Sequence, residues 1–331
     1  MKSSLQTIKN KIFEIDSIKS FNELALEIFF YQYKYNSLYQ KFVEQLSIKP
    51  KSITHFEQIP FLPVEFLKSH KIISGKSDYE TTFLSSGTNN TQRSCHYISD
   101  LNIYERSFTS AFNYFYGNVE DYVILALLPN YLEQKNSSLV YMVSNLIKNS
   151  KHKESGFYLK DINVLAGQLK DLNKNNRKVL LLGVSYALLD LAENFEFEIP
   201  NTIIMETGGM KGRREELTRE KLHEILKKSF GVKNIHSEYG MTELLSQAYS
   251  KGEGKFFCPP WMKILIRDIN DPLSLVKNKK TGGINIIDFA NINSCSFIAT
   301  QDLGRINDDG SFEVMGRFDD SDIRGCSLMI E

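Results

Sequence analysis

The sequence predicts an α/β fold with a helical N-terminal region and a β-rich C-terminal region. Between residues 78 and 250, short apolar runs such as KVLLLG and TIIMET alternate with amphipathic segments. This alternation is typical of parallel strands joined by crossover helices. After residue 255 the pattern changes to short strands separated by Gly, Asn and Asp. We therefore expect three regions, at residues 1–75, 76–254 and 255–331.

The N-terminal region is expected to be mainly helical. Apolar residues recur at helical spacing from Leu5 to Ile15, and an aromatic-rich helical stretch begins at Phe21. Pro60 and Pro63 then break the helical pattern. No continuous apolar stretch of the signal-peptide type occurs near the N-terminus.

The composition excludes some classes of function. The chain has 331 residues, and its 42% of hydrophobic residues can fill a substantial core. Forty basic side chains balance forty acidic ones, so we expect no nucleic-acid partner. The longest apolar runs are far shorter than the roughly 20 residues that span a bilayer. We therefore expect no membrane span and a cytoplasmic protein.

Four cysteines are scattered along the chain without CxxC spacing: Cys95, Cys258, Cys295 and Cys326. This pattern disfavours a zinc site and a disulfide framework, so each is expected to be a free thiol.

A loop of small residues, FLSSGTNNTQRS at 83–94, follows a predicted strand. Such a backbone can point several N–H groups and hydroxyls at an anion. The loop lacks the GxxxxGK[ST] pattern, so it is not a Walker loop. Taken alone, an ordinary surface loop is the more frequent interpretation.

A second polar cluster follows the strand-like KNIHS and contains Tyr239, Gly240, Thr242 and Glu243. A doubly wound sheet places its ligand crevice at this end of its strands. The cluster could offer an aromatic face to a base, a hydroxyl to a phosphate and a carboxylate to Mg²⁺. The alternative is a turn before a helix with a surface glutamate.

Two more candidates stand near the C-terminus. Asp302 in TQDLG could accept hydrogen bonds from two ribose hydroxyls, and Arg317 in GRFDD could reach a phosphate or the sugar. Either residue alone could equally belong to a solvated loop.

Together, the four motifs SSGT, YGMTE, QDLG and GRFDD occur in the order found in adenylate-forming enzymes, which the chain resembles. The stretches between them, including METGGMKGRREELTREKLHEIL and DIRGCSL, resemble the LuxE-type acyl-protein synthetase branch over nearly the whole chain. The resemblance implies the N-terminal domain of the adenylate-forming fold, with mixed sheets flanked by helices and a β-rich subdomain. It also implies ATP and Mg²⁺ as cofactors, a carboxylic acid of the fatty-acid type as substrate, and an acyl reductase, an acyltransferase or a carrier as a partner.

The resemblance assigns roles to individual residues. It implies that the phosphates of ATP are bound by Ser85, Ser86, Gly87 and Thr88, and that the adenine pocket is formed by Gly208, Gly209, Tyr239 and Gly240. Thr242 and Glu243 would bind phosphate and Mg²⁺, and Asp302 and Arg317 would bind the ribose.

Two features depart from the superfamily pattern. The loop reads SSGTNN without the usual lysine, so Arg93 or no residue takes the place of the mobile cation. The sequence ends near the point where long members begin a lid-like domain with a catalytic lysine. LuxE-type proteins are short in this way, and we expect no lid here.

Cys326 is the expected acyl acceptor, because LuxE-type synthetases pass the acyl group to a cysteine near the C-terminus. Nearby Arg324 and Arg317 provide a setting that favours a thiolate. The alternative is a small apolar filler at the end of a strand. The other three cysteines are expected to be inert.

Three other functions remain open at this stage. The chain could transfer the acyl group to CoA or another separate acceptor, or bind nucleotide without catalysis. A third alternative is a hydrolase, because GVSYA resembles a nucleophile elbow with Ser185 as nucleophile and His223 or His236 as base. Otherwise Ser185 is expected to cap a helix.

Overall fold

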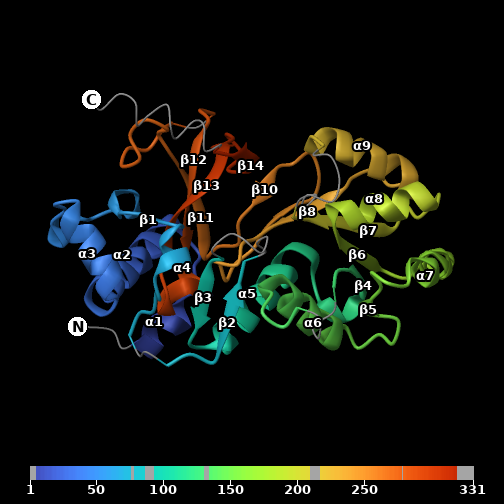
Figure 1. The fold of residues 1–331 in the computed structure, drawn as a ribbon, viewed down its shortest axis with the longest axis horizontal. Helices are drawn as coiled ribbons and strands as arrows, with labels where there is room; N and C mark the ends of the chain where they lie inside the picture. Colours follow the sequence, from blue (N-terminus) through green and yellow to red (C-terminus); the bar gives the residue numbers. More distant parts are fainter. Residues whose placement is uncertain are drawn as a thin grey trace. The chain divides into compact units, whose positions relative to one another are not determined.

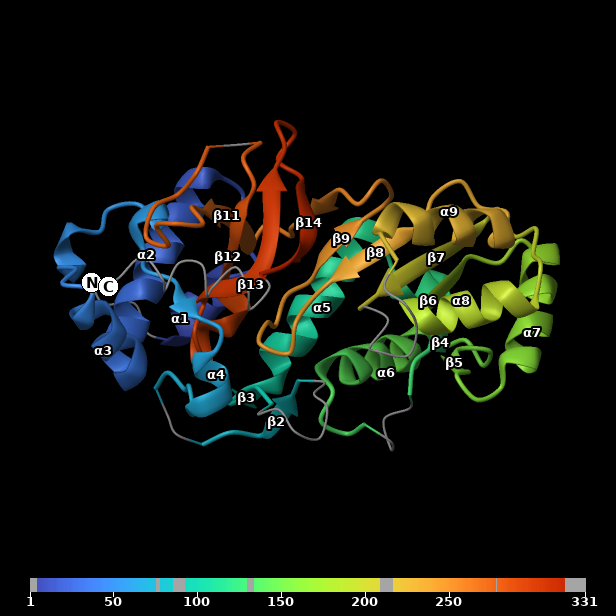
Figure 2. The same cartoon turned by 45° about the horizontal axis from the view of Figure 1, so that its top comes forward.

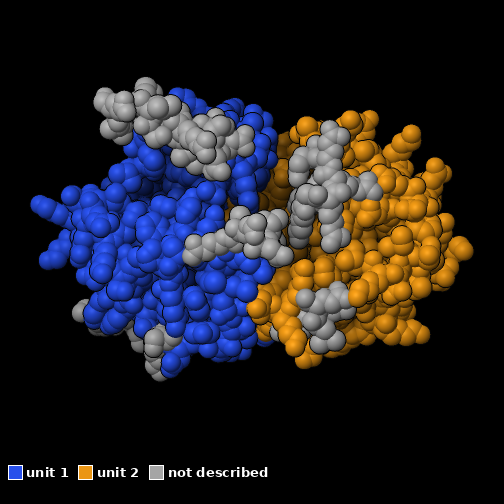
Figure 3. All heavy atoms as spheres, in the orientation of Figure 1, with its two compact units in different colours: residues 1–107, 242–246, 257–331 blue, residues 108–241, 247–256 orange. Residues whose placement is uncertain are grey.

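The computed structural model describes residues 5–75, 78–85, 93–129, 134–208, 217–277 and 279–318. The chain forms two compact units (Figure 3), and each is described here by itself. Unit 1 comprises residues 1–107, 242–246 and 257–331, and unit 2 comprises residues 108–241 and 247–256. The expected regions with boundaries at residues 76 and 255 remain a prediction.

Unit 2 is built around a sheet with the strand order β9-β8-β7-β6-β4-β5 (Figure 1). All neighbouring strands are parallel except β8 and β9. The strands are β4 (Val123–Leu127), β5 (Gly156–Phe157), β6 (Val179–Val184), β7 (Thr202–Thr207), β8 (His236–Tyr239) and β9 (Ala248–Ser250). The helices are α6 (Ser138–Ser150), α7 (Ile162–Lys174), α8 (Ser185–Asn194) and α9 (Arg219–Phe230), with the short turn η3 (Val119–Asp121).

The central strands of unit 2 are apolar because helices cover both faces of the sheet. Every residue of β4 and β6 is buried, as expected for parallel strands covered on both sides. In Figures 1 and 2, α8 and α9 lie together on one face, whereas α6 lies on the other. The Thr218 hydroxyl caps the start of α9, and Gly231 ends this helix with a left-handed φ of 64°.

Unit 1 combines helices with an antiparallel sheet in the order β11-β12-β13-β14, to which β1 adds in parallel beside β13. The strands are β1 (Leu62–Pro63), β11 (Met262–Arg267), β12 (Gly282–Asp288), β13 (Phe297–Ile306) and β14 (Phe312–Arg317). A separate hairpin joins β2 (Thr81–Leu84) to β3 (Cys95–Ile98). The helices and 3₁₀ turns are α1 (Leu5–Lys11), α2 (Ile18–Tyr35), α3 (Ser37–Gln45), α4 (Phe66–Ser69), η1 (Pro50–Ser52), η2 (Phe56–Gln58) and η4 (Phe289–Asn293). By sequence, α5 (Leu101–Tyr116) and β10 (Phe256–Phe257) cross from one unit to the other.

Helix α2 fixes the region of unit 1 around η4. Its start is closed by a capping box between Ser17 and Ser20. Near this end, the ring of Phe21 lies 4.5 Å from that of Phe289. Further along, the buried amide of Gln32 donates to the carbonyl oxygens of Asn291 and Ile292. This helix therefore holds the backbone of η4 by both apolar and polar contacts.

The structure confirms the mixed α/β fold. Strand and helix alternate in unit 2 as the apolar runs predicted, and the N-terminal part of unit 1 is mainly helical. Within the described ranges, no helix has both the length and the apolar character needed to cross a membrane.

Candidate nucleotide and acyl-transfer site

The predicted phosphate loop connects β2 to β3 in unit 1. Its base is closed by two hydrogen bonds: Ser85 N–H donates to the Ser94 carbonyl at 3.1 Å, and Ser94 N–H donates to Ser85 Oγ at 2.9 Å. The exposed Arg93 turns back and donates from Nε to the Ser85 carbonyl at 2.5 Å. The hairpin therefore sets where the loop starts and ends. The predicted loop residues Ser86, Gly87 and Thr88 lie outside the described residues.

The two predicted ribose-binding residues are paired in unit 1. Asp302 on β13 faces Arg317 on β14 in the antiparallel register, and Arg317 Nε lies 3.2 Å from Asp302 Oδ1. Asp302 is buried, whereas the Arg317 side chain is 72% exposed. Sequence reasoning missed Arg267, whose Nη2 donates to the Thr300 carbonyl at 2.6 Å and whose charge faces Asp302.

Residues 242–246 of unit 1, called here the 242–246 segment, are held by side chains from β3 and from η4 with its cap residue. His96 Nδ1 lies 2.8 Å from the Thr242 carbonyl oxygen, and Asn291 Nδ2 donates to the Glu243 carbonyl at 2.9 Å. The Asp288 carboxylate accepts from the backbone N–H groups of Leu245 and Ser246, at 2.8 and 3.0 Å. The backbone around the predicted phosphate and Mg²⁺ residues is thus fixed.

The Asp288 carboxylate is fully buried at the end of β12, where it begins η4. Burial raises its pKa to about 6, although hydrogen bonds from Ser246, Leu245 and Ala290 act in the opposite direction. The Ser246 hydroxyl also accepts from the indole N–H of Trp261 at 3.0 Å. The only tryptophan of the chain therefore contacts the 242–246 segment directly.

Glu243 has a different setting from that of Asp288. It is only 6% exposed, and its carboxylate has no hydrogen bond or ion pair within the described residues. Two free carboxylate oxygens on a fixed backbone fit a hard cation such as Mg²⁺, which binds one or two protein carboxylates together with substrate phosphates. No cluster of three or more potential metal ligands occurs in the described ranges, so the phosphates would have to supply further ligands.

The residues predicted to form the adenine pocket belong to unit 2. Gly208 directly follows β7 and has a φ of 69°, a conformation that favours glycine. Its carbonyl accepts a hydrogen bond of 2.6 Å from Ser185 Oγ, and Ser185 Oγ also lies 3.3 Å from Glu206 Oε2. These contacts fix the backbone where the adenine pocket is predicted to begin. Gly209 lies outside the described residues.

Tyr239 and Gly240 come directly after one another at the end of β8. The Tyr239 ring is buried and meets Phe256 edge-on, at 6.0 Å between centroids. A Cβ on Gly240 would lie 2.4 Å from Glu238 Oε1, so any side chain here would crowd that carboxyl group. Stacking of Tyr239 on a base remains a prediction.

Glu238 is a buried acid that the sequence did not single out. Its Oε2 accepts a 2.5 Å hydrogen bond from the Thr207 hydroxyl on the neighbouring strand. Burial raises the pKa of Glu238 to about 7, and the nearby Glu206 adds to this, whereas the Thr207 bond opposes it. Glu238 is therefore partly protonated at neutral pH.

The surroundings of Ser185 do not support the hydrolase alternative. Ser185 begins α8 but is 2% exposed, and its hydroxyl donates to a carbonyl and a carboxylate rather than to a histidine. His223 Nε2 instead faces Glu206 Oε1 at 3.6 Å, and His236 Nδ1 lies 3.2 Å from the Tyr116 hydroxyl. The expected helix cap was also wrong, because the cap of α8 is Val184 without a side-chain bond.

The comparison with protein families identifies the chain. The profile of the family described as "Acyl-protein synthetase, LuxE" matches residues 12–331, which is nearly the whole sequence. The chain belongs to the LuxE acyl-protein synthetase family. Members of this family are ligases. No curated protein matches the sequence.

Solved structures similar to this LuxE-family chain are adenylate-forming ligases. ATP-bound MatB from Rhodopseudomonas palustris has a TM-score of 0.56 and 14% identity, over 73% of this chain and 49% of MatB. A 2-hydroxyisobutyryl-CoA ligase in complex with 2-HIB-AMP and CoA has a TM-score of 0.67 and 12% identity, over 92% of this chain and 75% of the ligase. The chain thus spans about half the length of MatB. At these identities the likeness shows a shared fold.

The cysteines of the LuxE-family chain differ in their surroundings. Burial raises the pKa of both Cys258 and Cys295 to about 12, so neither thiol ionises readily near neutral pH. Cys95 is half-buried on β3. The predicted acceptor Cys326 lies outside the described residues.

Proposed function

We propose that the chain activates a carboxylic acid with ATP and Mg²⁺ and passes the acyl group to the thiol of Cys326. The observation that supports this best is the buried carboxylate of Glu243, which has no partner within the described residues, on a backbone fixed by His96, Asn291 and Asp288. The proposal combines this geometry with membership of the LuxE family.

In the first step, a carboxylate oxygen of the acid would attack the α-phosphorus of ATP, and pyrophosphate would leave. A carboxylate is a poor electrophile because its leaving group would be oxide; in the acyl-adenylate the leaving group is AMP. Catalysis of such a step needs mainly positioning and neutralisation of charge. Bound Mg²⁺ would supply positive charge beside the phosphate oxygens.

The residues of this chain would have separate roles in that step. Glu243 would hold the metal ion, and the Thr242 hydroxyl would bind a phosphate oxygen. Asp302 would accept from the ribose hydroxyls, while Arg317, whose guanidinium is largely exposed beside it, would contact the sugar or a phosphate. Arg93 donates to the Ser85 carbonyl in this structure, so it would have to leave that bond to act as the missing cation.

In the second step, the thiolate sulfur of Cys326 would attack the acyl carbon. A thioester forms, the bond to the phosphate oxygen breaks, and AMP leaves; the thiol proton goes to solvent. Cys258 and Cys295 are poor candidates because burial disfavours their thiolates. Among the described cysteines, this leaves Cys95 as the rival acceptor.

We further propose that the acid is a fatty acid and that an acyl reductase or acyltransferase takes up the acyl group. This follows from family membership, since apolar pockets discriminate weakly between chain lengths. Transfer to free CoA is the main alternative for the second step, and binding of nucleotide without catalysis is the alternative for both steps.

Intact-protein mass spectrometry tests the proposal. The purified chain is incubated with ATP, Mg²⁺ and a mixture of carboxylic acids of different length. We expect a mass gain that requires ATP, is removed by hydroxylamine and identifies the acid.

Matched variants locate the acceptor. The gain should disappear in Cys326→Ser and persist in Cys95→Ser. A gain that instead depends on Cys95 would refute Cys326 as the acceptor. If the wild type gains no mass but catalyses ATP–pyrophosphate exchange, the second step uses a separate acceptor. Absence of both would reject the proposed enzyme activity.

A further inference from the structure

His96 connects two of the predicted nucleotide motifs within unit 1. It lies on β3, the strand that leads out of the predicted phosphate loop, one residue after the paired Cys95. Its Nδ1 meets the carbonyl oxygen of Thr242, which lies 146 residues further along the chain. A single side chain thus joins the phosphate-loop hairpin to the 242–246 segment.

The chemistry of this contact is set by its surroundings. A carbonyl oxygen can only accept, so Nδ1 must carry the proton and donate it. His96 is 1% exposed, and burial lowers its pKa to about 4, so the ring is neutral at physiological pH. The bond is therefore a neutral one, present over the whole pH range in which the protein is expected to work.

The other anchors of the 242–246 segment come from outside the hairpin. Asn291 and Asp288 belong to η4 and its cap, which α2 holds through Gln32, and Ser246 also bonds to Trp261 and Ser107. Among the described residues that bond to this segment, His96 is the one that comes from the hairpin. Without it, the segment would keep its bonds to η4 but lose this bond to the β2–β3 hairpin.

We infer that His96 is a positioning residue that fixes the backbone of Thr242 and Glu243 against the β2–β3 hairpin. This inference rests on the proposed function, because it takes Thr242 and Glu243 as the residues that hold a phosphate and its metal ion. If these two residues hold the triphosphate and the metal ion, a small shift of their backbone would misplace the reacting phosphorus. Misplacement by about 1 Å can cost on the order of a hundredfold in rate.

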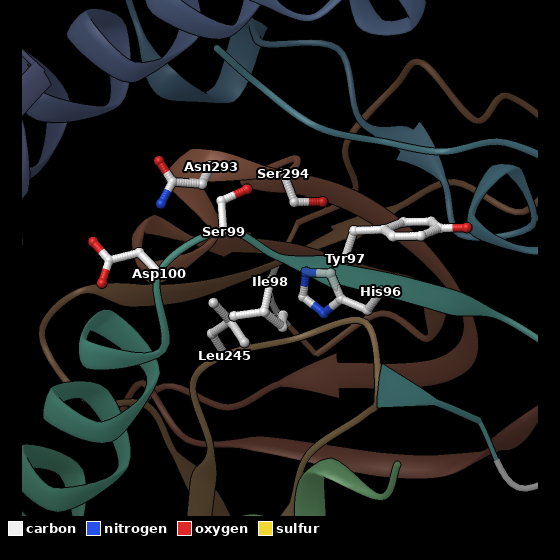
Figure 4. A pocket seen from close by; sticks show the side chains of 8 residues that line it. All are labelled: His96, Tyr97, Ile98, Ser99, Asp100, Leu245, Asn293 and Ser294. Carbon is white, nitrogen blue, oxygen red and sulfur yellow. The ribbon is translucent and has the colours of Figure 1, made fainter. Parts of the chain in front are cut away.

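The other nitrogen of the imidazole ring, Nε2, is buried and has no hydrogen-bond partner among the described residues. His96 borders a small cavity of about 10 Å³, which is lined by residues from β3 and the turn after it, by Leu245 and by the end of η4 (Figure 4). Ser99 lines the same cavity, and its hydroxyl likewise has no partner in the described part of the chain. Within that part, the ring makes one hydrogen bond, to Thr242.

A pair of amide substitutions separates this bond from simple packing. In His96→Asn, the amide nitrogen stands two bonds from Cβ, as Nδ1 does in histidine, so it can still reach the Thr242 carbonyl. In His96→Gln, it stands three bonds from Cβ, as Nε2 does, so the bond is lost. Ser99→Ala is the matched control, because it changes the same cavity without touching Thr242.

The first readout is ATP–pyrophosphate exchange. We expect kcat to fall about tenfold in His96→Gln, with a smaller change in the KM for ATP, because the loss concerns alignment more than binding. His96→Asn should stay within about threefold of the wild type, and Ser99→Ala should match it. Equal losses in the Asn and Gln variants, or no loss in Gln, would overturn the inference.

The second readout does not depend on the proposed function. Hydrogen exchange of the peptide covering residues 242–246 should be faster in His96→Gln than in the wild type, and unchanged in His96→Asn. If the wild type catalyses no ATP–pyrophosphate exchange, the proposed function fails, and the hydrogen-exchange measurement alone decides on the positioning role. Equal rates of hydrogen exchange in His96→Gln and the wild type would then refute that role.

Discussion

Glu238 and Glu243 are five residues apart in sequence and almost equally buried, at 8% and 6% exposed. Their hydrogen-bond partners nevertheless differ. In unit 2, Glu238 accepts from Thr207, and burial raises its pKa to about 7. In unit 1, Glu243 has no partner within the described residues, while the backbone around it is fixed by three other side chains. A buried acid that is partly protonated and hydrogen-bonded, as Glu238 is, contributes to the structure of its unit. A buried acid without a protein partner on a fixed backbone, such as Glu243, is available to bind a ligand.

Substitution of the two glutamates by glutamine tests this comparison directly. Glu243→Gln keeps the shape but removes the charge that would hold Mg²⁺, so ATP–pyrophosphate exchange should fall on the order of a hundredfold. Glu238→Gln changes a group that is already partly protonated and should keep most of the activity. The measurement is the initial exchange rate against Mg²⁺ concentration. Equal losses in both variants would remove the distinction between the two acids.

Asp288→Ala tests whether the fixed backbone in unit 1 depends on this carboxylate. The substitution leaves the N–H groups of Leu245, Ser246 and Ala290 without their acceptor, so we expect a loss of about 3 kcal/mol in the free energy of unfolding. Urea denaturation followed by the fluorescence of Trp261 measures it, because this side chain bonds to Ser246. A loss below about 1 kcal/mol would mean that the segment does not need this anchor.

Gly240→Ala tests the crowding around the acid in unit 2. The added Cβ would lie 2.4 Å from Glu238 Oε1, so we expect about 2 kcal/mol of destabilisation. Adding Glu238→Ala should restore much of it, because the atom that clashes is gone. The two single variants and the double variant are compared by urea denaturation. Additive losses would show that the cost at Gly240 has another cause.

The pH dependence of stability gives the smallest effect. Between pH 4.5 and about 7, folded Glu238 keeps a proton that the unfolded chain loses, so the free energy of unfolding falls as the pH rises through this window. Glu238→Gln should remove this contribution, changing the slope by about 1 kcal/mol per pH unit.

Two buried histidines, His96 and His236, change the stability with pH in the opposite direction. Their effect is the same in the wild type and in Glu238→Gln, so it does not alter the difference between the two slopes. Burial lowers the pKa of His96 and of His236 to about 4, so their contribution is lost as the pH falls from 6.5, equally in both proteins. Glu224→Gln, which removes a carboxylate at an exposed position on α9, is the matched control. An identical slope for wild type and Glu238→Gln would show that Glu238 titrates alike in the folded and unfolded chain.

The sequence predicted the fold of unit 2 because β6 and β7 are long apolar runs followed by amphipathic helices. It also predicted Asp302 and Arg317 as separate candidates, but only the antiparallel register of β13 and β14 makes them a pair. The role of Ser185 was misjudged, because its position at the start of a helix does not reveal that the hydroxyl turns to the Gly208 carbonyl.

The anchors of the 242–246 segment could not be predicted. His96, Asp288 and Asn291 lie between 42 and 146 residues from the atoms that they bind. No local spacing marks a long-range hydrogen bond, and each residue alone has an ordinary structural explanation. A buried aspartate directly after the apolar strand GGINII was the one visible signal, because such a group requires hydrogen-bond donors.

The composition of the two units has a consequence for how the chain folds during synthesis. Unit 2 is almost contiguous, and the whole of it has been translated once residue 256 has been added. Unit 1 takes its helices α1 to α4 from residues that precede unit 2 and its antiparallel sheet from residues that follow it. Since long-range contacts form late and domains emerge from the N-terminus onwards, unit 2 can fold on the ribosome while Phe21 and Gln32 of α2 still lack their partners in η4. During that interval this part of α2 is uncovered, which is when a chaperone would be most useful.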